Sequence, residues 1–195
     1  KNLFSNLNIS LNENKCLLIK GESGSGKSSL LMNLIGVLNG YSGEIKWGNI
    51  KISELNIDKF RSNIGYLGPE PFFIKGTIYQ NLTFGLSKEP KRNEIQKALK
   101  ISKSYQFIKN DLNLKNDIND FGEGLSMGQK QRIGLARALL RNPKILVFDE
   151  ITANLDKKTE FEIVKNLKKI KTHYTIIIAS HSNAFDDFTD LTINL

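Results

Sequence analysis

The stretch from Gly21 to Ser28 has the residue types and spacing to bind a polyphosphate. It reads Gly-Glu-Ser-Gly-Ser-Gly-Lys-Ser and matches the pattern G-x-x-x-x-G-K-[ST] at every fixed position. Its glycines let successive backbone N–H groups face one anion, Lys27 can reach the terminal phosphates, and the Ser28 hydroxyl can bind Mg²⁺. We therefore predict a nucleoside triphosphate site, against the weaker alternative of a glycine-rich turn. The expected contacts are Gly21, Glu22, Ser23, Gly24, Ser25, Gly26, Lys27, Ser28 and Ser29.

Two acids follow a continuous apolar run at 145–148, a pattern typical of a strand buried on both faces of a parallel sheet. Asp149, at the carboxyl end of that strand, could hold Mg²⁺ through water. Glu150 could polarise a water molecule in line with the γ-phosphate, which is general-base chemistry. An acidic loop after a strand is the simpler explanation, but the phosphate-binding pattern favours the functional one.

The segment Leu125-Ser-Met-Gly-Gln129 has the spacing of a capping box, in which Ser126 and Gln129 begin a helix. Helix initiation alone could explain both residues. A capped helix start with a glycine in its first turn also exposes N–H groups to a second anion, so the two roles are compatible.

These motifs together resemble the ATP-binding cassette (ABC) ATPases. Leu-Ser-Met-Gly-Gln resembles the LSGGQ signature, with Met127 at its third position, and the stretch 134–140 and the Asp149-Glu150 strand follow at the family's spacing. Asn154-Leu-Asp156 resembles the D-loop, and His181 resembles the switch histidine. The resemblance covers nearly the whole chain.

The resemblance implies ATP hydrolysis with ATP and Mg²⁺ as cofactors, by a head-to-tail dimer that holds two ATP molecules. The partner is a second nucleotide-binding domain, in a homodimer or a heterodimer. Lys27, Glu150 and His181 would be catalytic, Ser28 and Asp149 would bind the metal, and Asp156 would link the subunits. The signature residues would contact the partner's ATP; they are Ser126, Met127, Gly128 and Gln129.

An exporter-type transporter is the branch that the sequence resembles. Gly76-Thr-Ile78-x-x-Asn81-Leu, after Pro71-Phe-Phe73, is similar to a stretch that lies near the membrane domain in exporters. Gly122-Glu-Gly124 resembles a shortened cross-linking loop. The resemblance implies a transmembrane domain as a further partner, and a location at the cytoplasmic face of the cell membrane.

The sequence departs from the family pattern at three places. Pro69 stands where the family has a glutamine that reaches Mg²⁺, so Glu70 or a water molecule would have to substitute. Ser29 replaces a common threonine. The aromatic residue that stacks on adenine would lie upstream of Lys1. Since the sequence opens without methionine, we expect a piece of a longer polypeptide that lacks its N-terminal edge and membrane portion.

Alternating strands and helices predict an α/β fold: a P-loop NTPase, ABC-type ATPase core with a mostly parallel sheet, an N-terminal antiparallel β part and a helical subdomain. We expect one domain at 1–195 with the helical subdomain at about 69–140. Predicted strands are 7–11, 16–19, 43–47, 64–67, 145–148 and 175–179. Predicted helices are 28–38, ending at Asn39-Gly40, a helix from 126 to about 141, and 157–170.

Composition fits a soluble globular protein, with 39% hydrophobic and 25% charged residues. The single cysteine, Cys16, excludes an internal disulfide and is expected to be a buried structural thiol. The net charge of +8 keeps a soluble ABC ATPase acting on nucleic acid or ribosomes as an alternative. Lysines at 165–171 without interleaved aromatics favour a solvated helix face, so no nucleic acid is expected. Pro69 motivates a third class, a regulatory domain that binds nucleotide without hydrolysis.

Overall fold

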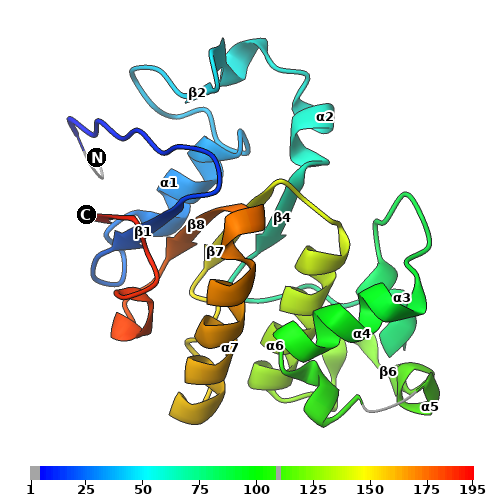
Figure 1. Cartoon of the computed structure of the whole chain (residues 1–195). Coiled ribbons are helices and arrows are strands. Elements are labelled where there is room, and N and C mark those ends of the chain that lie inside the picture. The colour runs from blue at the N-terminus through cyan, green and yellow to red at the C-terminus, as the bar shows by residue number, and fades with distance from the viewer. Residues whose placement is uncertain (1–4, 109–110) are drawn as a thin grey trace.

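The central feature of the computed structural model, which describes residues 5–108 and 111–195, is a five-stranded parallel sheet (Figure 1). Its strand order is β4-β7-β8-β1-β9. The strands are β1 (Cys16–Lys20), β4 (Ile64–Leu67), β7 (Ile145–Asp149), β8 (Thr175–Ala179) and β9 (Leu191–Asn194). The predicted α/β fold with a mostly parallel sheet is confirmed.

Side chains of the central strands alternate between two separate hydrophobic clusters, because successive residues of a strand point to opposite faces. Leu17, Ile19, Val147 and Ile177 pack with α1 (Lys27–Leu34) on one face. The intervening residues of the same strands pack with α6 (Met127–Leu140) and α7 (Lys157–Ile170) on the other. Burial on both faces explains why these strands are continuous apolar runs.

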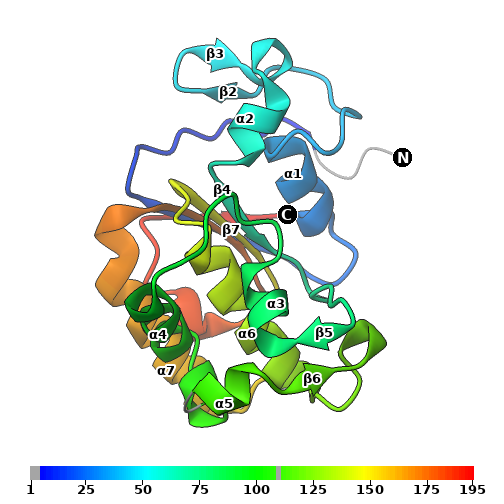
Figure 2. The ribbon, with the colours of Figure 1, turned by 90° about the vertical axis from the view of Figure 1, so that its right-hand side faces the viewer.

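A group of short helices covers the outer side of α6 (Figure 2). It contains α3 (Ile78–Thr83), α4 (Arg92–Ile101) and α5 (Asp111–Leu114), with the 3-10 helices η2 (Ser104–Gln106) and η3 (Asp120–Gly122). The antiparallel strands β5 (Gly76–Thr77) and β6 (Asp117–Ile118) complete it. Ile95 and Leu99 of α4 are buried in the core.

A second small group of elements lies between α1 and β4 in the chain. It contains the antiparallel strands β2 (Lys46–Trp47) and β3 (Ile50–Lys51), followed by η1 (Ile52–Glu54) and α2 (Ile57–Arg61). The Trp47 Nε1 donates to the carbonyl oxygen of Leu34 at 2.8 Å, and its ring packs on Phe60. This tryptophan therefore ties the group to the end of α1. Two further 3-10 helices are η4 (Lys171–His173) and η5 (Asn183–Phe185).

Three sequence predictions for residues 7–47 differ from the structure. The expected strand at 7–11 is absent, since Ile9 and Leu11 pack against the α1-side core without pairing to another strand. The helix predicted at 28–38 ends at Leu34 rather than at Asn39-Gly40, because Gly36 adopts a left-handed conformation with φ 70°. The strand β9 was not predicted, and the strand expected at 43–47 is reduced to β2.

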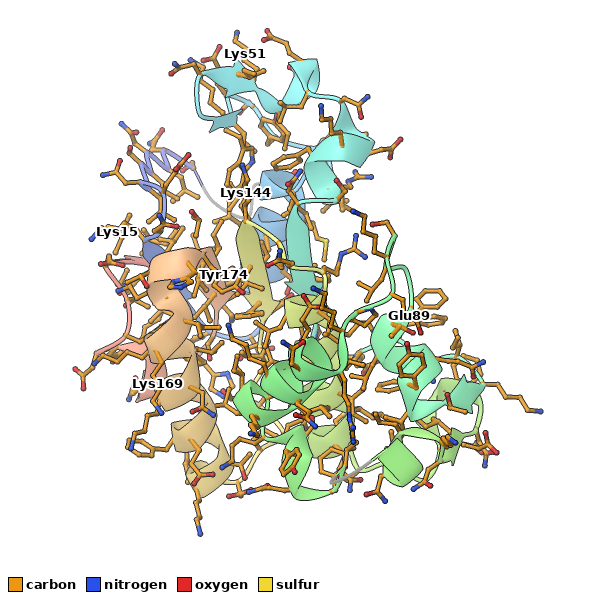
Figure 3. The ribbon with its side chains drawn as sticks, turned by 45° about the vertical axis from the view of Figure 1, so that its right-hand side comes forward. Lys15, Lys51, Glu89, Lys144, Lys169 and Tyr174 are labelled. Carbon is orange, nitrogen blue, oxygen red and sulfur yellow. The ribbon has the colours of Figure 1, made fainter. Side chains whose placement is uncertain are left out.

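The described ranges contain no helix long and apolar enough to cross a membrane. Lysines such as Lys51 and Lys169 point away from the body of the protein (Figure 3). Lys169 lies on the lysine-rich helix α7 and is exposed as expected, whereas Lys171, directly after that helix, is half-buried and pairs with Asp190 at 2.7 Å.

Candidate nucleotide site

The loop between β1 and α1 has backbone conformations that its glycines make accessible. Gly24 and Gly26 have φ values of 83° and 101°, which side chains disfavour. A Cβ at Gly24 would meet no heavy atom within 4 Å, so the requirement there is conformational rather than steric. Helix α1 starts at Lys27 without a side-chain cap, and its first N–H groups are therefore available to an anion.

The Lys27 side chain is buried, 7% exposed, and its partners lie in this loop. Its Nζ donates to the carbonyl oxygens of Gly21 (2.8 Å) and Glu22 (2.9 Å) and lies 3.5 Å from Glu150 Oε1. The ammonium group thus stands between the phosphate loop and the acid after β7, where it can meet a phosphate oxygen.

Asp149 ends β7 as a buried carboxylate, 1% exposed, whose two oxygens have no hydrogen-bond partner in the described part of the chain. Burial raises its pKa most strongly, and Glu150 raises it further. The Ser28 hydroxyl, which lies close without a well-formed hydrogen bond, and Lys27 lower it. Among the described residues, no group of three or more His, Cys, Asp or Glu side chains could hold a metal ion by itself. A carboxylate and a hydroxyl without a full protein cage suit Mg²⁺, which keeps waters and binds substrate phosphates.

Glu150 meets His181 because they follow neighbouring parallel strands, β7 and β8, whose carboxyl ends share one edge of the sheet. His181 Nδ1 lies 3.0 Å from Glu150 Oε2. The backbone of Glu150 is in the left-handed region, with φ 53°, and its N–H donates to the carbonyl oxygen of Ala179 at 2.9 Å. Such a conformation costs about 1–3 kcal/mol in a residue with a side chain, so surrounding contacts must maintain it.

These groups open into one cleft of about 760 Å³, a size typical of a small-molecule site. The cleft is lined by Glu22, Ser23, Gly24, Gly26, Lys27, Ser28, Ser29, Pro69, Glu150, Ala153 and His181. The structure therefore brings together the phosphate loop, the acid and the histidine that the sequence singled out. Pro69 also lines the cleft and contributes no side-chain donor.

The signature segment does not line this cleft. The Ser126 Oγ accepts from the Gln129 N–H at 3.2 Å, and Gln129 Oε1 accepts from the Ser126 N–H at 2.9 Å, so the predicted capping box is formed. Met127 is 38% exposed. A Cβ on Gly128 would lie 2.9 Å from the carbonyl oxygen of Asn154, which shows close packing of the signature against the D-loop segment.

Asp156 caps α7 by accepting from the Thr159 N–H at 3.0 Å. Hydrogen bonds from Thr159 lower its pKa, so this exposed acid is charged at neutral pH. The sequence-predicted D-loop aspartate is thus also a helix cap, and capping is compatible with a contact outside the chain.

Sequence reasoning missed two buried polar residues beside the cleft. Gln131, 1% exposed on α6, points its Nε2 at the carbonyl oxygen of Glu150 at 3.4 Å. Glu160, 5% exposed on α7, binds hydroxyls of two loops that border the cleft. An acid four residues after the capping Asp156 was the only available signal, and it also fits an ordinary first-turn acid.

Comparison with known proteins places these motifs in context. Residues 4–153 match the family model described as ABC transporter. The lactococcin-G-processing and transport ATP-binding protein of Lactococcus lactis subsp. lactis is 40% identical over 162 residues, 83% of this chain and 23% of that protein. The ATP-dependent lipid A-core flippase of Francisella novicida is 31% identical over 180 residues, 92% of this chain and 30% of that protein.

A solved structure of a bacterial Atm1-family ABC exporter with ATP bound is similar, with a TM-score of 0.87 and 28% identity. The match covers 93% of this chain and 32% of that one. The chain thus spans about a quarter to a third of the length of the proteins it matches.

Proposed function

The chain belongs to the ABC transporter family, and we propose that it binds and hydrolyses ATP to drive an exporter. The observation that supports this most directly is the pair Glu150 and His181 at the cleft that the phosphate loop and Lys27 border. We propose one ATPase domain at 1–195 with a helical subdomain at about 69–140, attached to membrane-spanning parts outside this chain.

Each group in the cleft has a distinct role in the proposed hydrolysis. The N–H groups of the loop and of the start of α1 bind the phosphates, and Lys27 exchanges its carbonyl partners for phosphate oxygens. Glu150 orients the attacking water and accepts its proton, since its carboxylate is partly exposed and lines the cleft beside Lys27. His181, whose Nδ1 lies 3.0 Å from Glu150 Oε2, would contact the γ-phosphate.

Ser28 and Asp149 would hold Mg²⁺ in this site. The metal would supply positive charge beside the β- and γ-phosphates, where negative charge builds up during transfer. The two unpartnered oxygens of Asp149 support this assignment, because a buried carboxylate without donors is costly unless a cation or its bound water meets it.

A second nucleotide-binding domain completes the proposed site. Ser126, Met127, Gly128 and Gln129 do not line the cleft of their own chain, and Ser126 and Met127 at the start of α6 are exposed. In a head-to-tail dimer these groups would meet the partner's γ-phosphate, and Asp156 would contact the partner. ATP would favour the closed dimer through contacts that the open state lacks, and hydrolysis would remove them.

A transmembrane domain would be the partner that responds to the closing and opening of this dimer. The ATPase domain would work at the cytoplasmic face of the membrane. Phe72 and Phe84 are 56% and 46% exposed, and their rings lie 5.9 Å apart beside the exporter-like stretch 76–82. Neighbouring exposed aromatic rings favour a docking surface over a solvated one. The relatives named above have different cargo in their names, so this shared domain supplies the ATP-driven step rather than the choice of cargo.

The variant Glu150→Gln tests the proposal, with Glu162→Gln as a matched control because Glu162 pairs with Lys103 away from the cleft. We expect hydrolysis of MgATP to fall to near background, at least about 100-fold, since general-base catalysis contributes 10²–10⁴-fold. ATP should then trap a dimer, detected by light scattering. Unchanged turnover would refute the role of Glu150, and a wild-type chain that binds ATP without hydrolysis would favour the regulatory alternative.

A further inference from the structure

Glu160 is a buried acid in the first turn of α7 that joins two loops beside the cleft. Its Oε1 accepts from Thr152 Oγ1 at 2.9 Å and from Ser182 Oγ at 2.6 Å. Its Oε2 lies 3.2 Å from the Nζ of Lys157, a side chain that is 94% exposed. The main partners of this carboxylate are therefore the two hydroxyls, and the lysine is a weak one.

The two hydroxyls belong to the segments that carry Glu150 and His181. Thr152 lies in the turn after β7, where the Ala153 N–H donates to the carbonyl oxygen of Glu150 at 3.2 Å. Ser182 follows His181 directly and begins η5, with its Oγ accepting from the Ala184 N–H at 3.2 Å. These contacts form a closed circuit. The chain connects Glu150 to Thr152 and Ser182 to His181, Glu160 joins the two hydroxyls, and His181 Nδ1 lies 3.0 Å from Glu150 Oε2.

The charge of Glu160 suits a fixed double acceptor. Burial raises its pKa, but hydrogen bonds from Ser182, Thr152 and Lys157 outweigh burial, and the pKa is lowered overall. The carboxylate is therefore ionised at neutral pH. Because the Ser182 oxygen already accepts from a backbone N–H, its hydrogen is directed to Glu160, and hydrogen bonds to a charged acceptor are stronger than neutral ones.

We propose that Glu160 is a positioning residue for hydrolysis, which sets the distance between the Glu150 carboxylate and the His181 imidazole by holding Thr152 and Ser182 together. The proposal rests on the function proposed above for Glu150 and His181. Glu160 is not among the residues that line the nucleotide cleft, so it is not placed to touch the reacting atoms. It acts through the two loops, in the manner of an outer residue that orients a catalytic one.

Histidine NMR tests the positioning directly, because the chain has only two histidines and His173 is remote from the circuit. Imidazole spectra of the nucleotide-free 195-residue chain would be compared for wild type, Glu160→Ala, Glu160→Gln and Ser182→Ala. We expect Glu160→Ala and Ser182→Ala to move the His181 signals and leave the His173 signals in place. Glu160→Gln retains an acceptor oxygen and should produce the smaller change, and the control Glu162→Ala should produce none.

Steady-state hydrolysis of MgATP tests the consequence for the reaction. Glu160→Ala should lower kcat about tenfold or more, the equivalent of one hydrogen bond to a charged group, while the KM for ATP stays within about twofold. In a His181→Ala background the same change should have little further effect, because residues that act as a unit are not additive. Ser182→Ala keeps the buried acid and guards against loss of folding in Glu160→Ala.

His181 signals that stay unchanged in both Glu160→Ala and Ser182→Ala would overturn the proposal. Signals that move while kcat does not, or a Glu160 effect that is fully additive with His181→Ala, would overturn it as well. If the proposed ATPase function itself is wrong, the wild-type chain would show no turnover of ATP. The NMR signals of His181 would still decide whether Glu160 positions the segment that carries His181.

Discussion

Replacing Asp149 by Asn should stabilise the nucleotide-free protein and weaken its response to Mg²⁺ and ATP. The carboxylate is 1% exposed, and its two oxygens have no hydrogen-bond partner in the described part of the chain. An unsatisfied buried polar group costs about 1–3 kcal/mol, and more when charged. Asparagine removes the charge but remains polar, so we expect a gain of about 1–2 kcal/mol in the free energy of unfolding.

For a chain of this size that gain corresponds to a rise in Tm of about 2–8 °C. The wild type should respond more strongly to a magnesium complex of a non-hydrolysable ATP analogue. At 100 times the dissociation constant, such a ligand adds about 2.7 kcal/mol, or about 5–11 °C. Asp149→Asn should lose the part of this shift that depends on the metal, so the order of the two Tm values should reverse when Mg²⁺ and the analogue are present together.

The pH dependence of the free energy of unfolding tests the same prediction independently. The folded-state pKa of Asp149 is raised above its ordinary value of 3.8, mainly by burial, so the folded protein binds this proton more tightly than the unfolded chain. Stability therefore falls as pH rises through the folded-state pKa. The advantage of Asp149→Asn should be complete above that pKa and should disappear as pH falls below 3.8.

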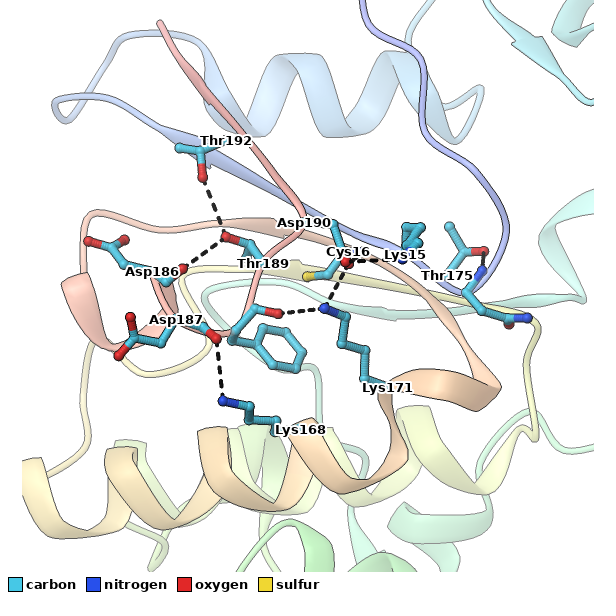
Figure 4. A network of polar contacts seen from close by, with 12 residues as sticks. Lys15, Cys16, Lys168, Lys171, Thr175, Asp186, Asp187, Thr189, Asp190 and Thr192 are labelled. Carbon is cyan, nitrogen blue, oxygen red and sulfur yellow. Dashed lines mark hydrogen bonds and ion pairs between the residues drawn. The ribbon is translucent and has the colours of Figure 1, made fainter.

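Asp190 is a matched control of opposite sign (Figure 4). Burial raises its pKa, but bonds from Lys171 at 2.7 Å and the Cys16 N–H at 2.8 Å outweigh burial, and the pKa is lowered. Asp190→Asn should therefore lower Tm at neutral pH, and the loss should vanish as pH falls through the folded-state pKa. Scanning calorimetry with EDTA, with the analogue alone and with the magnesium complex measures all of these shifts.

The reasoning about Asp149 fails if Asp149→Asn melts below the wild type in EDTA, because the carboxylate would then have a stabilising partner. It fails for the metal if the magnesium complex raises both Tm values equally.

Two further changes test the neighbouring parts of the site. Lys27→Ala should weaken ATP binding at least about tenfold by titration calorimetry, because a hydrogen bond to a charged group is worth about 1.5–3 kcal/mol; the surface variant Lys165→Ala should bind normally, and unchanged affinity in Lys27→Ala would argue against the phosphate loop. Gly128→Ala should lower Tm by a few degrees despite better helix propensity, because its Cβ would lie 2.9 Å from the Asn154 carbonyl oxygen and overpacking costs about 1–3 kcal/mol; an equal or higher Tm would mean that the D-loop segment adapts freely.

Local interactions made several parts of this protein readable from its sequence. The helix at 157–170 and the strand at 175–179 have the predicted bounds, since a capping aspartate and a continuous apolar run define them nearby in the chain. The capping box at Ser126 also forms as predicted, because its two hydrogen bonds join residues three positions apart. The failures lie where local rules compete: the helix from Lys27 ends at the left-handed Gly36 rather than at the later Asn39-Gly40.

Other features depend on contacts between distant parts of the chain, which no local pattern records. Sequence spacing named Glu150 and His181 separately, but adjacent parallel strands decide that their side chains meet. The burial that raises the pKa of Asp149 comes from helices and strands packed on both faces of the sheet. Glu160 looked like an ordinary first-turn acid until the fold placed Thr152 and Ser182 beside it. Residue types and short spacings thus determined which groups are present, and tertiary packing decided which groups meet and which charges lose their water.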